Sequence, residues 1–326
     1  MNRWEALVAS VESSFNQSLP PDEVIVVIDY NEELRARALD EFVNATVIAN
    51  DQSKGLSGAR NTGVAASSGD VIVFLDDDAY AESKWLERLL DPMSDPTVAG
   101  VGGWIVPHWE TELAPWFPET FYWILGCSYA GLPQSDQPIR NPIGANMAIR
   151  RQVFSEVGGF TAGLGRIGQV PLGCEETELC IRYTKHRPGD RFVMSREAVV
   201  HHRVPASRLT WHYFWTRCWA EGLSKAAVSS LVGPNAGLAA ERKHVLQSLP
   251  REIAQSTRVM RSHPDTGATR IGLILAGTAF AAAGLVRGRI SVMRTPIASG
   301  SGEAVFRVSI PENDGALHPP ATGNPG

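Results

Sequence analysis

The sequence predicts an α/β fold with a mostly parallel sheet flanked by helices, and two observations support it. Short apolar strands alternate with short helices along the first half of the 326-residue chain. Such alternation places helices over both faces of a parallel sheet. Acidic residues also follow the first and third strands, at the sheet edge where ligands of such folds bind. An apolar fraction of 44% allows a sizeable core, and a net charge of -5 argues against general nucleic-acid binding.

The elements follow from the apolar pattern in chain order. Trp4, Leu7 and Val11 share one helical face, so a helix is expected near the start, ended by Pro20 and Pro21. The expected strands are then residues 22–29, 45–50, 70–78 and 98–107, and the expected helices are residues 31–42, 56–67 and 83–93. A strand leading into a helix is expected over residues 144–160.

Three regions interrupt or follow this pattern. Pro107–Pro142 is rich in aromatic residues and proline and is expected to be an irregular excursion over the sheet. Ile271–Val286 is an apolar run flanked by arginines. As a helix it would be roughly 24 Å long, against a hydrocarbon core of roughly 30 Å, so it could span a membrane with snorkelling arginines, lie in the interface or be a core helix. After Pro296 the Gly- and Pro-rich tail is expected to be disordered.

We therefore expect three parts: residues 1–225 as the α/β domain, 226–295 as a helical, membrane-associated region, and 296–326 as the tail. The four cysteines form no CxxC pair, which is typical of reduced thiols in the cytosol. The N-terminus carries Glu5 and Glu12 and lacks the apolar core of a secretory signal.

The stretch VIVFLDDDAY, Val71 to Tyr80, ends a buried strand with three aspartates. Because side chains alternate along a strand, Asp76 and Asp78 should point one way and Asp77 the other. Two carboxylates on one side suit Mg²⁺ or Mn²⁺, which would take the phosphate oxygens of a nucleotide diphosphate as further ligands. The alternative is a solvated turn that caps the next helix.

Four motifs in order resemble the family 2 glycosyltransferases, which have the GT-A fold, over roughly residues 1–225. They are EVIVVIDYN, KGLSGARNTGV, FLDDDA and GCEETELCIR. The resemblance implies that Asp29 holds the nucleobase, that Lys54, Arg60 and Asn61 contact the nucleotide, that Asp76 faces the ribose and that Asp78 binds the metal.

In the fourth motif the resemblance implies a catalytic base, at Glu176 or its neighbour Glu175. A base must take the proton of the acceptor hydroxyl, and crowding among Glu175, Glu176 and Glu178 could raise one pKa toward a useful value. The alternative is a Glu-rich helix start favoured by the helix dipole.

A later histidine completes the metal site in many relatives, in a pattern that falls here on His202, with His201 beside it. The alternative is a surface pair near the basic stretch Arg182–Arg217, which itself suits phosphates, an anionic lipid surface or plain solvent. Trp211, Phe214, Trp215 and Trp219 follow at helical spacing and would lie against a membrane or pack on the domain.

The chain departs from the family's pattern at its start. The family normally opens with a buried central strand of the type VSVVIPTYN, whereas this sequence begins at the helix that follows it. We therefore expect an earlier start codon or a truncated product, since a missing central strand leaves unpaired backbone groups and an apolar gap.

The resemblance implies an inverting, metal-dependent glycosyltransferase at the cytoplasmic face of the membrane. It would move a sugar, favouring a UDP-sugar, to a lipid, polyprenyl phosphate or polysaccharide-precursor acceptor, with Mn²⁺ or Mg²⁺. One alternative is a nucleotidyltransferase of the same fold, which would not need Glu176 as a base. Another is a degenerate, non-catalytic domain that binds nucleotide sugar.

Overall fold

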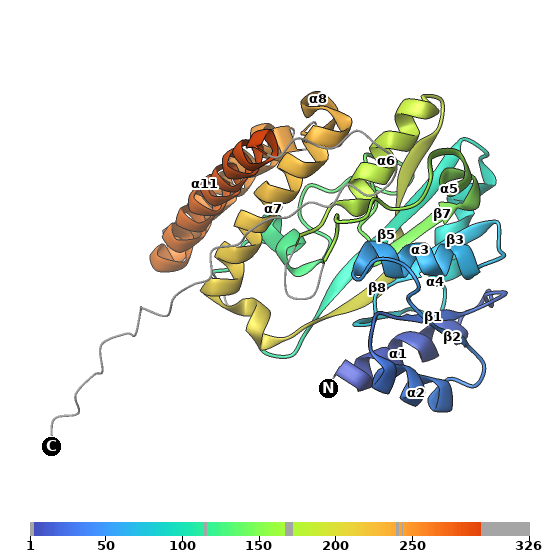
Figure 1. The fold of residues 1–326 in the computed structure, drawn as a ribbon. Helices are drawn as coiled ribbons and strands as arrows, with labels where there is room; N and C mark the ends of the chain where they lie inside the picture. Colours follow the sequence, from blue (N-terminus) through green and yellow to red (C-terminus); the bar gives the residue numbers. More distant parts are fainter. Residues whose placement is uncertain (1–2, 114–115, 167–171, 239–240, 243, 295–326) are drawn as a thin grey trace, which may run out of the picture.

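The computed structural model describes residues 3–113, 116–166, 172–238, 241–242 and 244–294. The expected tail after Pro296 lies outside these residues. Within them, strands and helices alternate as the sequence predicts, from a first helix at the N-terminal end to a long last helix (Figure 1).

The N-terminal part is a small layer of its own. It contains α1 (Arg3–Phe15), β1 (Ile25–Ile28), α2 (Glu32–Glu41) and β2 (Thr46–Ala49), with β1 and β2 paired in parallel. Leu7 and Val11 of α1 pack with Val26, Ile28 and Phe42 in a separate apolar cluster. Asn31 caps α2 by accepting a hydrogen bond from the backbone of Leu34.

The main sheet has the strand order β3-β7-β5-β8-β4, with β6 also paired to β8. Its strands are β3 (Val71–Leu75), β4 (Ala79–Ala81), β5 (Val98–Trp109), β6 (Pro138–Ile139), β7 (Asn146–Arg150) and β8 (Arg191–Val204). The helices around it are α3 (Leu56–Ala66), α4 (Trp85–Leu90), α5 (Arg151–Val157) and α6 (Glu175–His186), with a 3-10 turn η1 (Asp91–Ser94) after α4.

This sheet is mixed, which corrects the expectation of a mostly parallel one. Only the β5–β8 pair is parallel in it, and β7 runs antiparallel to both β3 and β5. Parallel pairing needs a crossover that returns the chain to the same end of the sheet. The described part of the irregular segment between β5 and β7 carries only a 3-10 helix, η2 (Glu119–Leu125), and the short β6, and β7 enters from the opposite end.

A large open cleft of about 2650 Å³ begins between the two sheets. In the described residues β1 pairs only with β2, and β3 only with β7, so the facing edges of β1 and β3 share no ladder. Both edges line the cleft together with α1. The cleft lies where the resemblance places an additional central strand, and it continues past the aspartates to the C-terminal helices.

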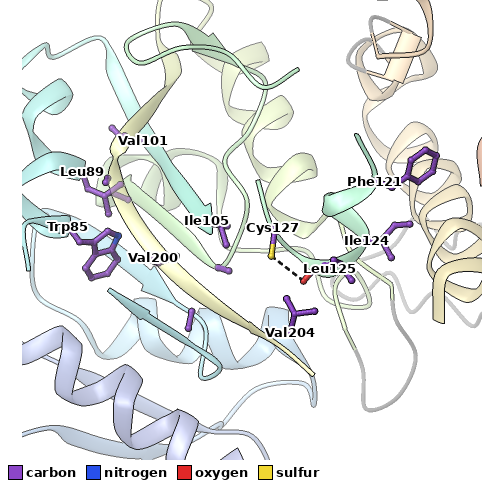
Figure 2. Packing of buried hydrophobic residues seen from close by; sticks show 14 of the residues in the cluster. Trp85, Leu89, Val101, Ile105, Phe121, Ile124, Leu125, Cys127, Val200 and Val204 are labelled. Carbon is purple, nitrogen blue, oxygen red and sulfur yellow. Dashed lines mark hydrogen bonds between the residues drawn. The ribbon is translucent and has the colours of Figure 1, made fainter. Parts of the chain in front are cut away.

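The main apolar core contains residues of α4, β5 and β8. Trp85 and Leu89 of α4, Val101 and Ile105 of β5, and Val200 of β8 are buried together (Figure 2). Phe121, Ile124 and Leu125 of η2 extend this cluster toward the C-terminal helices. Aromatic and aliphatic burial therefore anchors the irregular excursion, together with the short ladder between β6 and β8.

Long helices complete the fold. A 3-10 turn η3 (Ala206–Leu209) leads from β8 into α7 (Trp211–Val232), and α8 (Pro234–Gly237), a π-helical turn η4 (His244–Ser248), α10 (Leu249–Ser262) and α11 (Pro264–Arg294) follow. The domain boundary expected at residue 225 lies inside α7. Helices α7 and α11 lie side by side (Figure 1). Their backbones approach closely, because a Cβ on Gly222 would come within 2.1 Å of the Ala281 carbonyl oxygen.

Candidate active site

Strand pairing brings the aspartate triplet to His202. Strands β4 and β8 are antiparallel with Ala79 opposite His202, so Asp78 lies next to the histidine although they are distant in sequence. One ligand atom from each of Asp76, Asp78 and His202 lies within 4.8 Å of the other two. Asp77 points away and pairs with Arg3 of α1 at 3.0 Å, as strand alternation predicts.

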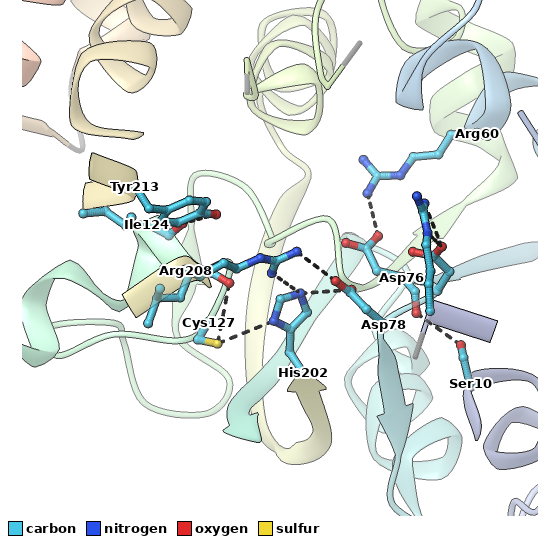
Figure 3. Close-up of polar contacts among 12 residues, drawn as sticks. Ser10, Arg60, Asp76, Asp78, Ile124, Cys127, His202, Arg208 and Tyr213 are labelled. Carbon is cyan, nitrogen blue, oxygen red and sulfur yellow. Dashed lines mark hydrogen bonds and ion pairs between the residues drawn. The ribbon is translucent and has the colours of Figure 1, made fainter. Parts of the chain in front are cut away.

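Asp78 is held between two cationic partners (Figure 3). Its Oδ1 lies 3.1 Å from His202 Nε2, and its Oδ2 accepts a hydrogen bond from Arg208 Nη2 at 3.0 Å. Burial alone would raise the pKa of Asp78. The hydrogen bonds and charges of His202 and Arg208 outweigh it and hold that pKa well below its usual range.

His202 is buried, with 3% of its surface exposed. Its Nδ1 lies 3.8 Å from the Cys127 sulfur, which fixes the ring from the side opposite Asp78. Burial would lower the pKa of His202, but Asp78 and Cys127 offset it and raise the pKa to about 10. Two carboxylates and one imidazole are a donor set that suits Mn²⁺ or Mg²⁺, so the residues present fit a divalent ion.

Arg60 of α3 joins the metal cluster to the glutamate motif. Its Nη2 donates to Asp76 Oδ1 at 3.2 Å and its Nη1 to Glu175 Oε1 at 2.5 Å. Arg60 is 7% exposed, so the guanidinium is buried between two carboxylates. Glu175 is buried as well, and among the described residues its Oε2 has no hydrogen-bond partner. Arg60 therefore fixes the acidic residues relative to one another and also lines the cleft, where its contact with the nucleotide stays a prediction.

Glu176 is the second residue of α6 and lines the cleft. The helix starts sharply, because Cys174 just before it adopts a left-handed conformation with φ of 75°. Burial and the neighbouring charge of Glu175 raise the pKa of Glu176 to about 8. A carboxyl group with a raised pKa, facing a cleft, is suited to take a proton from a bound hydroxyl group.

A buried ionic network behind α6 was not predicted. Lys225 of α7 pairs with Glu221 at 3.0 Å and with Glu241 at 2.9 Å, and Arg140 also pairs with Glu241 at 2.8 Å. The charge of Lys225 lowers the pKa of Glu176, which opposes the effect of burial. A lysine on the apolar face of a helix, four residues after Glu221, was the available sequence signal, but its partner Glu241 comes from a later segment.

Not all of the residues predicted to bind the nucleotide line the cleft. Asp29 and Lys54 line the cleft. The carboxylate of Asp29 accepts hydrogen bonds from Asn50 Nδ2 at 2.7 Å and from the backbone N–H of Gly55, which holds the loop that carries Lys54. Asn61 does not line the cleft, because its amide bridges the backbone N–H and carbonyl of Phe160.

The two histidines have different surroundings. His201 points away from the cluster, stacks on Tyr80 with ring centroids 5.0 Å apart and lies 3.1 Å from Glu82. Most described members of the basic stretch are similarly engaged by local partners, as in Arg187 with Glu156 and Arg191 with Asp95. Arg208 is the member that reaches the predicted metal ligands.

The aromatic residues after β8 pack mainly on the protein. Trp211 stacks on Trp116 with centroids 4.3 Å apart, Phe214 is buried against Phe121, and Trp215 contacts Phe280 of α11 at 4.9 Å. These contacts favour the packing alternative for α7. They also place α11 beside the excursion that borders the cleft.

Comparisons with known proteins identify the class. A model of glycosyl transferase family 2 matches residues 1–158. A glucosyl-dolichyl phosphate glucuronosyltransferase of Haloferax volcanii is 35% identical over 235 residues, covering 71% of this chain and 75% of the relative. A probable N-acetylgalactosaminyltransferase 9 of Caenorhabditis elegans is 31% identical over 182 residues, covering 48% of this chain and 31% of the relative.

A solved mannosyltransferase from Pyrobaculum calidifontis, in complex with GDP-mannose and Mn²⁺, has a similar fold. Its TM-score is 0.52 at 18% identity, and the match covers 86% of this chain and 83% of that one. Fold and site thus define a glycosyltransferase of the GT-A fold. The chain belongs to the family 2 glycosyltransferases. The predictions of the fold, the family and a sugar-transferring enzyme are confirmed.

Proposed function

We propose that the protein moves a sugar, with inversion, from a UDP-sugar to a hydroxyl group of a polyprenyl-phosphate-linked or other lipid-linked acceptor. One observation carries the proposal: the acidic cluster Asp76, Asp78 and His202 and the separate carboxylate of Glu176 open onto one cleft. Arg60 joins Asp76 of this cluster to Glu175, the neighbour of Glu176. A transferase of this kind needs both parts, one for the leaving diphosphate and one for the attacking hydroxyl.

Asp78 and His202, with Asp76 beside them, would hold Mn²⁺ or Mg²⁺. A bound divalent ion supplies positive charge that stabilises the departing diphosphate. The contribution of the chain is to fix the ligands. Cys127 orients the imidazole of His202, and Arg60 restrains the carboxylate of Asp76.

Glu176 would be the base that removes the acceptor's proton. Glu175 is committed to Arg60 at 2.5 Å, whereas no described contact of Glu176 occupies its carboxylate in this way. This contrast supports Glu176, rather than Glu175, as the proposed base. A nucleotidyltransferase would not need Glu176 as a base, so that alternative does not account for the raised pKa of Glu176.

Asp29 and Lys54 would border the nucleotide, since both line the cleft on the side of β1. The favoured first donor is UDP-glucuronate, for two reasons. The Haloferax volcanii relative is a glucuronosyltransferase. In addition, Arg166 and Arg217 line the cleft together with Arg208, and cationic side chains suit the carboxylate of a uronic acid.

Helix α11 would rest on the cytoplasmic surface of a membrane. Residues Pro264–Ser291 are long and apolar enough to span one. However, one face of α11 packs closely on α7, and a Cβ on Gly284 would come within 2.3 Å of the Trp219 carbonyl oxygen. The opposite face exposes Leu275, Val286 and Ile290. A helix with one protein-facing and one exposed apolar face favours a peripheral position beside a lipid acceptor.

The enzymatic proposal is tested by a nucleotide-release assay over a panel of nucleotide sugars with Mn²⁺ and a polyprenyl-phosphate-linked glycoside as acceptor. We expect UDP release from one donor, increased by the acceptor and abolished by Glu176→Gln. Formation of pyrophosphate from a nucleoside triphosphate and a sugar 1-phosphate, with no UDP release from any nucleotide sugar, would contradict sugar transfer by this site.

The membrane proposal is tested by flotation of the full chain with vesicles of zwitterionic or anionic lipid. The double variant Leu275→Glu/Val286→Glu should lose flotation, whereas the control Leu39→Glu, at another exposed leucine, should retain it. Equal flotation of both variants would remove α11 as the contact surface.

A further inference from the structure

Arg208 binds the same side chains that would ligate the metal. Its Nη2 donates to Asp78 Oδ2 at 3.0 Å, and its Nη1 lies 3.5 Å from His202 Nε2 (Figure 3). His202 Nε2 in turn lies 3.1 Å from Asp78 Oδ1. In the metal-free protein a guanidinium thus supplies the positive charge that this acidic site requires.

This contact and a bound divalent ion are in conflict. An ion ligated by Asp78 and by Nε2 of His202 would lie about 2 Å from each ligand atom. Arg208 Nη1 lies 3.5 Å from Nε2 of His202, the atom that would face the ion, so the positive charges of Arg208 and the ion would repel each other. Arg208 binds Oδ2 of Asp78 and leaves Oδ1 beside His202, so a bound ion would weaken the present contact of Arg208 by repulsion.

The turn that carries Arg208 is short and attached at both ends. Helix η3 (Ala206–Leu209) contains no fully buried residue, but Leu209 packs partly against the main core. The Thr210 hydroxyl group accepts a hydrogen bond from the Tyr213 backbone and donates one to the Ser207 carbonyl oxygen, so the turn stays joined to the start of α7. Movement of the guanidinium therefore requires only rotation of the long, flexible side chain of Arg208.

A displaced Arg208 needs a new anionic partner. Once a divalent ion neutralises Asp78, the nearest new negative charge would be the diphosphate of the donor, which binds the same ion. Arginine forms paired hydrogen bonds with phosphate oxygens, and Arg208 already lines the cleft. Arg166 and Arg217 line it too, so this side of the cleft is cationic.

We propose that Arg208 is an exchangeable counter-ion of the metal site: it holds Asp78 in the metal-free protein, leaves when a divalent ion binds, and then binds the donor diphosphate. This inference rests on the proposed function. It makes metal and donor loading ordered, because the ion must arrive before Arg208 can reach the diphosphate. It also means that loss of Arg208 should strengthen metal binding and weaken donor binding.

The test measures binding rather than turnover, with the full chain in detergent. Mn²⁺ affinity is measured by the electron paramagnetic resonance signal of free Mn²⁺ without nucleotide, and UDP affinity by calorimetry at saturating Mn²⁺. For Arg208→Met we expect Mn²⁺ to bind about tenfold more tightly and UDP about tenfold more weakly, as for the loss of one charged hydrogen bond in each state.

The matched control is Arg191→Met, at the far end of β8, where Arg191 pairs with Asp95 at 2.7 Å. Both affinities should stay at the wild-type values. Arg208→Lys, which keeps the charge, should bring Mn²⁺ affinity back toward wild type, and thermal unfolding of each variant confirms that it is folded.

Two results would overturn the inference while the proposed function stands. Unchanged or weaker Mn²⁺ binding by Arg208→Met would mean that Arg208 stays on Asp78 and supports the metal. Unchanged UDP binding would mean that Arg208 never reaches the diphosphate. Failure of the wild-type protein to bind either Mn²⁺ or UDP would instead overturn the proposed function, and the inference with it.

Discussion

Asp78 and Glu176 are carboxylates on the same cleft, but their surroundings shift their pKa values in opposite directions. Asp78 is held by His202 and Arg208, which keep its pKa well below the usual range. Glu176 is half-buried beside Glu175, and its desolvation and the charge of Glu175 raise its pKa to about 8. One group therefore stays charged and suits a cation, while the other can accept and return a proton. Neighbouring residues, rather than residue type, divide the two roles.

The largest effect is expected at the charged group. Asp78→Asn removes a metal ligand and leaves His202 and Arg208 without their anionic partner. We expect Mn²⁺ binding to be lost and UDP release to fall by about a thousandfold or more, measured by the nucleotide-release assay. Asp77→Asn is the control within the same triplet, since Asp77 faces Arg3, and should stay within about threefold of wild type. Equal losses in both variants would mean that the triplet acts only as a structural turn.

Glu176→Gln should separate chemistry from binding. We expect kcat to fall by about a hundredfold to ten-thousandfold, the usual contribution of a general base, with Mn²⁺ and UDP affinities unchanged. A variant that keeps its kcat would assign the base to another residue. A loss of UDP affinity would place Glu176 in the donor site instead.

The third target is Arg60, which joins Asp76 to Glu175. Arg60→Met leaves Glu175 buried without its cationic partner and frees Asp76. Breaking a buried ion pair costs about 3 kcal/mol or more, so the midpoint of urea unfolding should fall clearly. The control is Arg35→Met, because Arg35 pairs with Glu32 near the surface, and its unfolding midpoint should hardly change. Equal stability of the two variants would show that Arg60 does not tie the site together.

The smallest effect is a shift of the pH profile. The base must be deprotonated, so kcat should rise about tenfold per pH unit below the pKa of Glu176, near 8, and level off above it. Glu175→Gln removes a charge that raises this pKa, so the rise should move to lower pH. Lys225→Met removes a charge that lowers it, so the rise should move to higher pH. A profile that does not respond to either change would exclude Glu176 as the titrating group.

The sequence predicted the parts of the site that depend on local pattern. Strand alternation placed Asp76 and Asp78 on one side and Asp77 on the other, as the ion pair with Arg3 shows. Apolar runs located the strands and helices of the first 160 residues apart from the short β4 and β6, because burial and period are local properties of the chain, but they did not locate β8.

The missed features depend on partners distant in sequence. Arg60 and Glu175 are separated by 115 positions, and Arg208 and Asp78 by 130. Adjacent residues on a helix also face different directions. For this reason Arg60 reaches the cleft, whereas Asn61 forms hydrogen bonds with the Phe160 backbone. The mixed sheet was missed for a similar reason, since the direction of β7 is set by the irregular segment before it.

The most direct test of this division of roles is the position of Mn²⁺ in a crystal of the Glu176→Gln variant with UDP, located by anomalous scattering. The account predicts one ion ligated by Asp78 and His202 and by phosphate oxygens of UDP, with residue 176 facing the cleft and not bound to the ion. An ion ligated by Glu175 or by residue 176, with Asp78 still paired to His202 and Arg208, would contradict it.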